Sequence, residues 1–249
     1  MASQRNSRAA SRDSLFSPTR GSLLVALREG DARSRGQAHE TLCATYWYPL
    51  YCYARRYGLG PEDAQDVVQD FLATAVERKV FERSEPGKGR LRAFLLGGLK
   101  HQVSEWRRGQ RAEKRGGGVA PLPLHAPESE ERYATEPADD CTPEQIFARR
   151  WAQTILGKVR TELAADWAAR GKPAVFAALD PYLLSELAQE CCARLAGELG
   201  LTESNVKVTL HRLRQEFSER LRAWVAQTVA SPREVSSEMA ELAALFRYL

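Results

Sequence analysis

Long apolar runs are absent from this sequence of 249 residues, since none approaches the roughly 18 residues that a membrane-crossing helix requires. Cysteine is scarce too: its five copies are an odd number without a C-x-x-C pair, which fits neither a disulfide framework nor a zinc ribbon. Charge of one sign is also lacking, because 36 basic residues face 32 acidic ones and leave a formal net charge of +4. We therefore expect a cytoplasmic protein in a reducing compartment, with no membrane partner.

Composition divides the chain into segments. Residues 1–20 are rich in Arg and Ser but lack the apolar stretch of a secretory signal, so they are predicted to be a disordered tail, with a transit peptide as the minor alternative. Residues 116–141 begin with three glycines and continue with prolines and acidic residues, which predicts a flexible acidic linker. The linker separates a unit at 21–115 from a unit at 142–230, and residues 231–249 follow as a last amphipathic helix.

The predicted fold class is all-α, with two small helical domains, because apolar residues recur every three or four positions and no stretch alternates. One stripe, on a helix with an acidic outer face, consists of Ala64, Val67, Val68, Phe71, Leu72, Ala75 and Val76. A second stripe consists of Leu91, Phe94, Leu95, Leu99, Gln102, Val103 and Trp106. Gly97 and Gly98 interrupt it at a combined cost of about 2 kcal/mol, which packing or function must offset.

Start and stop signals frame the second unit. Thr142, Pro143 and Gln145 form a capping box with proline at the first helical position, and Gly171 predicts the end of that helix. Short helices are expected around Phe176 and Tyr182.

Residues 193–214 have the layout of a helix-turn-helix, with an apolar helix, a turn at Gly200 and a second helix capped by Thr202. The second helix carries no acid from Asn205 to Arg214, and a recognition helix enters the DNA major groove with its N-terminal end first. The candidate DNA contacts are therefore Thr202, Ser204, Asn205, Lys207, Val208, His211, Arg212 and Arg214. A helical hairpin with a solvated basic face is the alternative interpretation.

The segment from Ala196 to Arg214 resembles the region 4 helix-turn-helix of extracytoplasmic-function sigma factors, a subfamily of the sigma-70 family. The shared residues are Ala196, Leu199, Gly200, Thr202, Glu203, Val206, Lys207, Arg212 and Arg214. The first unit resembles region 2 of the same family at Tyr48–Tyr51, Ala54–Arg56, Pro61–Phe71 and Arg90–Leu95. It departs from the family where a common Trp is Phe94, a frequent Asn is His101 and a frequent Asp is Glu105.

The resemblance implies a transcription initiation factor whose partners are core RNA polymerase, at its β′ clamp helices and β flap, and promoter DNA at the minus-ten and minus-thirty-five elements. It implies that the clamp helices dock on Asp63, Asp66, Gln69 and Asp70. It implies that the minus-ten element is bound by Arg90, Arg92, Lys100, His101, Arg107, Arg108 and Arg111, whose charges suit phosphates. The resemblance implies association with the nucleoid and leaves open whether an anti-sigma protein binds.

No enzyme is expected, since Gly87-Lys88-Gly89 lacks the rest of a phosphate-binding loop and His39-Glu40 lacks the second His of a zincin. No metal or cofactor is expected, because the cysteines are interpreted as small buried apolar residues. Two alternatives remain. One is a stand-alone helix-turn-helix regulator that binds duplex DNA without polymerase, and the other is a helical interaction protein that binds no DNA.

Overall fold

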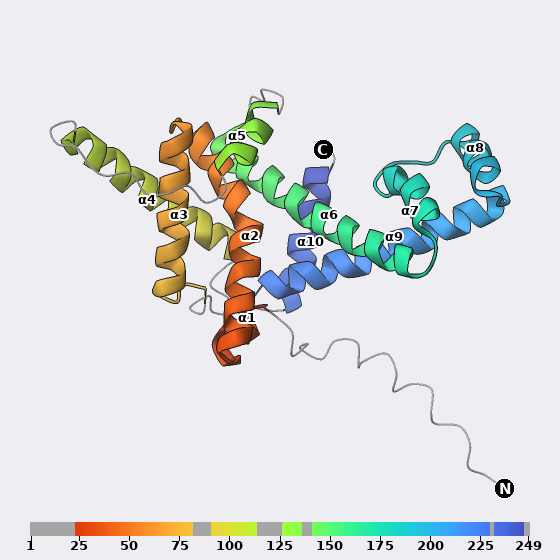
Figure 1. Cartoon of the computed structure of the whole chain (residues 1–249), viewed down its shortest axis with the longest axis horizontal. Coiled ribbons are helices and arrows are strands. Elements are labelled where there is room, and N and C mark those ends of the chain that lie inside the picture. The colour runs from red at the N-terminus through yellow and green to blue at the C-terminus, as the bar shows by residue number, and fades with distance from the viewer. Residues whose placement is uncertain (1–22, 82–90, 114–125, 136–140, 230–231, 247–249) are drawn as a thin grey trace, which may run out of the picture.

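The computed structural model describes residues 23–81, 91–113, 126–135, 141–229 and 232–246, and these residues form helices and their connections without a β-strand (Figure 1). The all-α fold class is therefore confirmed. None of the described helices is both long and apolar enough to cross a bilayer. The elements in chain order are α1 (Leu23–Glu29), α2 (Ala32–Arg56), α3 (Pro61–Glu77), α4 (Leu91–Glu113), α5 (Ala126–Thr135), α6 (Pro143–Ala169), α7 (Pro173–Leu179), the 3-10 turn η2 (Asp180–Tyr182), α8 (Gln189–Leu199), α9 (Glu203–Thr228) and α10 (Pro232–Phe246).

Local signals set the ends of α6. Thr142 Oγ1 accepts a hydrogen bond from the Gln145 backbone N–H at 3.3 Å, and Gln145 Oε1 accepts one from the Thr142 backbone N–H at 2.9 Å. This reciprocal pair is the predicted capping box. Beyond the other end of the helix, Gly171 adopts φ +73°, a left-handed conformation that side chains with a Cβ disfavour. Both predicted boundaries of this helix are confirmed.

Helices α3 and α4 pack closely because a glycine stands at their contact. A Cβ built on Gly98 would lie 2.7 Å from Cε2 of Phe71, whereas one on Gly97 would meet nothing within 4 Å. Gly98 therefore permits the close approach, and this packing offsets the helix-propensity cost of Gly98, whereas Gly97 has no such contact. The predicted stripe of α3 is buried from Ala64 to Ala75, and in α4 the side chains of Leu91, Leu95, Leu99 and Val103 are buried.

Phe94 corrects the predicted stripe of α4, because its side chain is 49% exposed. The buried residues of this helix recur at intervals of four, from Leu91 through Leu95 and Leu99 to Val103. Phe94 stands three positions after Leu91 and so lies on the flank of that row, one turn before Gly98. The exposed ring belongs to the solvent face of α4.

Helix α6 joins the two predicted units, since its contact with α2 is the most extensive between any two described helices. Trp151 of α6 and Tyr46 of α2 are both fully buried in one continuous apolar core. Lys158 of α6 donates a hydrogen bond from Nζ to Thr45 Oγ1 of α2 at 2.6 Å. The division into two domains stays a prediction, while the described residues of both units pack on one another.

Helix α5 lies where the sequence predicts a flexible linker, and its contacts explain the difference. The Glu130 carboxylate accepts hydrogen bonds from Nε and Nη2 of Arg55 at 3.0 and 2.8 Å and a further one from the Tyr51 hydroxyl. The ring of Tyr133 meets the ring of Tyr51 edge-on, with centroids 6.3 Å apart. These partners on α2 are remote in sequence, so composition alone gave no sign of them.

Candidate nucleic-acid interface

A tight turn joins α8 to α9. Gly200 ends α8 in the left-handed region with φ +63°, and Thr202 Oγ1 then accepts a hydrogen bond from the Asn205 backbone N–H at 3.2 Å. Cys192 is fully buried in α8, and its Sγ lies 3.6 Å from the Glu203 carbonyl oxygen at the start of α9. The sequence therefore places both helix ends as predicted, with the Thr202 hydroxyl engaged as a cap.

The two faces of α9 separate apolar from polar residues. The inward stripe of α9 consists of Val206, Leu210, Leu213, Phe217 and Leu221, which recur every three or four positions and are buried. The outer face near the start of the helix is solvent-exposed, and its residues are Ser204, Asn205, Val208, His211 and Arg212. This face carries no carboxylate, so a polyanion can approach it without meeting a like charge.

Besides Thr202, two more of the predicted DNA contacts are engaged within the protein. Lys207 Nζ donates to Gln189 Oε1 of α8 at 3.0 Å, although the Lys207 side chain remains exposed. Nη2 of Arg214 donates to the carbonyl oxygens of Tyr182 and Ser185 at 2.9 and 2.6 Å, which differs from the predicted phosphate contact. Arg214 is half-buried and fixes the connection that precedes α8, because a guanidinium can satisfy two carbonyls at once.

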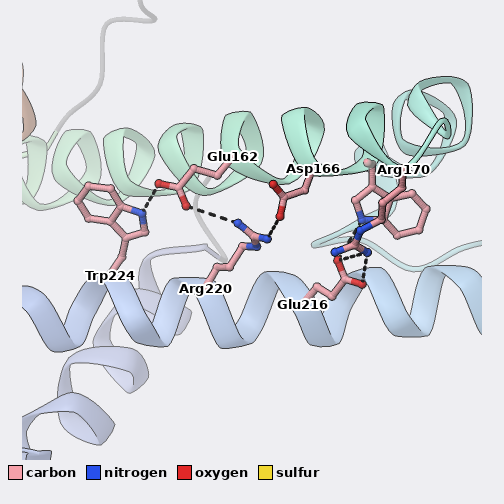
Figure 2. Close-up of polar contacts among 7 residues, drawn as sticks. Glu162, Asp166, Arg170, Glu216, Arg220 and Trp224 are labelled. Atoms are coloured by element: carbon pink, nitrogen blue, oxygen red, sulfur yellow. Dashed lines mark hydrogen bonds and ion pairs between the residues drawn. The ribbon is translucent and has the colours of Figure 1, made fainter. Parts of the chain in front are cut away.

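A polar ladder holds α9 against α6, with the two helices antiparallel (Figure 2). Its rungs are Glu162 with Trp224 and Arg220, Asp166 with Arg220, and Glu216 with Arg170 and Trp167. The distance from Trp224 Nε1 to Glu162 Oε1 is 2.9 Å. Exposed ion pairs stabilise little individually, so the ladder acts mainly by fixing the register of the two helices.

The ladder determines where the outer face of α9 is presented. Helix α6 also packs on α2, so the start of α9 occupies a fixed position relative to the first unit. Along the longest axis of the molecule, α8 and the start of α9 lie at the opposite end from α3 and α4 (Figure 1).

The predicted polymerase-docking residues share the outer side of α3. Asp70 is exposed, whereas Asp63, Asp66 and Gln69 are half-buried. The pKa of Asp66 is raised above its usual value, first by partial burial and then by the negative charges of Asp70, Asp63 and Glu62. The like charges on this face therefore repel one another, and a cationic partner would relieve that repulsion.

The predicted minus-ten contacts on α4 have different environments. The side chains of His101 and Arg108 are 70% and 69% exposed and lie near Glu105, while Lys100 Nζ lies 2.7 Å from Glu144 Oε1 of α6. Arg107 donates to the Tyr57 carbonyl oxygen at 2.6 Å and stacks over the Tyr57 ring. Two further predicted contacts, Arg90 and the side chain of Arg111, lie outside the described residues.

Arg92 is a correction, because its side chain is 12% exposed and points into the protein. Its Nε lies 2.5 Å from Glu238 Oε1 of α10, its Nη2 lies 3.1 Å from Glu238 Oε2, and it also pairs with Glu241. The guanidinium lies over the ring of Trp151, 4.8 Å from its centroid. Arg92 is thus bound to the protein in this arrangement and is not available to a DNA phosphate.

Glu238 and Glu241, the carboxylate partners of Arg92, are not among the residues that the sequence pattern singles out. The side chain of Glu238 is 2% exposed. The pKa of the Tyr46 hydroxyl is raised first by the burial of Tyr46 and then by the negative charge of Glu238. Arg92 and Glu238 are distant in the chain, and each fits the local charge pattern of a solvated helix. No local signal could have found the pair.

Nothing in the described residues points to a metal or redox centre. No group of three or more His, Cys, Asp or Glu side chains is placed to hold an ion within the described ranges. All five cysteines lie in those ranges, and none of them forms a disulfide.

Family models, curated proteins and solved structures were compared with the chain, and none of them matches it.

Proposed function

We propose that the chain is a sigma factor of the extracytoplasmic-function type, which binds core RNA polymerase and directs it to a promoter, without enzymatic activity of its own. The observation that carries the proposal is the exposed outer face near the start of α9, which carries no carboxylate and which Gly200 and the Thr202 cap hold in a helix-turn-helix. This face suits the major groove, with Ser204, Asn205 and Arg212 as hydrogen-bonding side chains.

The acidic face of α3 supports the polymerase part of the proposal. A free-standing DNA-binding protein gains nothing from an acidic patch, which repels phosphates, whereas Asp63, Asp66 and Asp70 suit a basic protein surface. On α4, the exposed side chains of His101, Arg108 and Phe94 suit a strand of unpaired bases, through phosphate contacts and stacking. The proposed site of action is promoter DNA in the nucleoid, and regulation by an anti-sigma protein is left open.

A stand-alone transcriptional regulator is the second candidate, and two observations favour it. Arg92 is withdrawn from solvent and α6 joins both units, so the described arrangement presents α9 more completely than α4. A regulator that needs only α9 would bind duplex DNA in this arrangement, without polymerase.

Co-elution with bacterial core RNA polymerase separates the two candidates. We expect the wild-type chain to co-elute in gel filtration and the double variant Asp63→Lys/Asp66→Lys to elute separately. The matched control, Glu29→Lys/Glu219→Lys, makes the same change of charge at two exposed positions away from α3 and should co-elute normally.

One result would exclude the sigma factor, and a second would exclude the proposed docking face on α3. The first is failure of the wild-type chain to co-elute, together with salt-sensitive binding to duplex DNA that Arg212→Glu abolishes. The second is equal loss of co-elution in the double variant and its control. That result would show that the change of net charge, and not the acidic face of α3, determines binding to polymerase.

A further inference from the structure

Val208 is a large apolar residue on the surface of α9, where it is 47% exposed. Among the described residues the other large apolar residues exposed to solvent are Tyr57, Phe94 and Leu184, and none of these lies on α9. Val208 is the apolar member of the outer face defined above, about one and two-thirds turns after the Thr202 cap.

The neighbours of Val208 leave its methyl groups uncovered. Lys207 extends toward α8, where its ammonium is held by Gln189, and Gln189 in turn donates to Glu203 Oε2 at 2.5 Å. The two long side chains near the start of the helix are thus drawn to the α8 side. On the outer face, Ser204 stands one turn before Val208 and Arg212 one turn after it, and both are exposed.

The chemistry of valine restricts what Val208 can recognise. It neither donates nor accepts hydrogen bonds, and its β-branched side chain has one strongly preferred rotamer in a helix, so it presents a fixed apolar surface. In the DNA major groove the apolar feature that distinguishes one base from the others is the C5-methyl group of thymine.

We propose that Val208 is a specificity-determining residue that contacts the C5-methyl group of one thymine in the DNA site of α9. This inference rests on the proposed binding of duplex DNA by α9 and holds for either candidate function. Ser204 and Arg212 flank Val208 and provide the polar contacts that place it in the groove. The preference of Val208 is for a 5-methylpyrimidine and not for a hydrogen-bonding pattern.

The test uses the full chain, alone and with core polymerase, and a duplex library with a randomised segment from which bound sequences are recovered. In the recovered site, each thymine is replaced singly by deoxyuridine, which removes one methyl group and leaves base pairing unchanged. We expect one position at which this replacement weakens binding by the wild-type chain about fourfold, the effect of one methyl-sized apolar contact.

Val208→Ala should bind the thymine and deoxyuridine forms of that site equally well. The shorter side chain keeps the helix, since alanine has the higher helix propensity, and circular dichroism checks the fold. The control is Leu184→Ala, which removes a similarly exposed apolar side chain outside α9 and should keep the fourfold preference.

The outcomes separate this inference from the proposed function. If a defined sequence is recovered but no thymine methyl affects binding, or if Val208→Ala keeps the preference, the inference is overturned and DNA binding by α9 stands. If no sequence is recovered, with or without polymerase, both are overturned. In that case the exposed valine is an ordinary surface residue or part of a protein contact.

Discussion

Replacing Glu238 with glutamine removes one charge from the buried cluster that joins α4 to α10. The Glu238 side chain is 2% exposed and receives two hydrogen bonds from Arg92, which is itself 12% exposed. Loss of one partner from a buried ion pair costs about 3–5 kcal/mol, because the remaining charge stays desolvated. Glu241 still faces Arg92, so we expect the lower end of this range for Glu238→Gln.

Glu241→Gln is the matched control, because it removes the same charge from the same guanidinium at a position that is 49% exposed. Its expected cost is about 0–1 kcal/mol, as for other solvent-exposed ion pairs. The double variant Arg92→Met/Glu238→Leu should be more stable than either of its single variants, since it leaves no buried charge behind.

The measurement is urea denaturation at neutral pH, followed by far-UV circular dichroism and extrapolated to zero urea. The reasoning predicts a clear separation between Glu238→Gln and Glu241→Gln. Equal losses in the two variants would refute it, since the burial of Glu238 would then contribute nothing. A double variant that is less stable than both single variants would likewise contradict the account.

Three further predictions concern stability and docking. Gly98→Ala should lower the melting temperature, because overpacking against Phe71 costs about 1–3 kcal/mol. Gly97→Ala has open space around its new methyl group and should raise the melting temperature. Shifts of the same sign in the two variants would contradict the packing of α3 on α4. Burial raises the pKa of Tyr53 from 10.0 to about 12, so as pH rises the hydroxyl loses its proton in the unfolded chain before it does so in the folded protein. This residue should therefore leave the unfolding free energy unaffected below pH 10.0 and lower it as pH rises toward about 12. Urea denaturation of Tyr53→Phe over the same pH range should show a smaller decline. Asp66→Asn should raise the unfolding free energy by about 0.2–0.5 kcal/mol through relief of like-charge repulsion, while it weakens polymerase co-elution; a loss of stability would argue against repulsion on α3.

Local signals predicted much of the fold. The capping box at Thr142, the left-handed glycines and the repeating apolar stripes depend on residues only a few positions apart, so one sequence contains all the information they need. The same holds for the start of α9, where the inward stripe defines the outer face. Its exposure to solvent agrees with that prediction, and DNA binding there stays a prediction.

Contacts between distant segments could not be predicted in this way. An apolar stripe shows that a helix has a buried side but not which helix covers that side. The packing of α6 on α2 could therefore not be predicted from the sequence pattern. Arg92 lies near a basic segment that resembles a phosphate-binding helix, and its carboxylate partner is 146 residues away. Phe94 followed the period of α4 approximately but fell at the flank of its buried row. In each case tertiary packing decided between alternatives that the local pattern left equal.

Transcription in vitro tests the central claim most directly. Core RNA polymerase with the wild-type chain should start transcripts at defined positions on genomic DNA fragments, while core polymerase alone starts none at those positions. Asp63→Lys/Asp66→Lys should abolish these starts and Glu29→Lys/Glu219→Lys should preserve them. If the wild-type chain co-elutes with polymerase or binds DNA but directs no defined start, the chain is not a sigma factor.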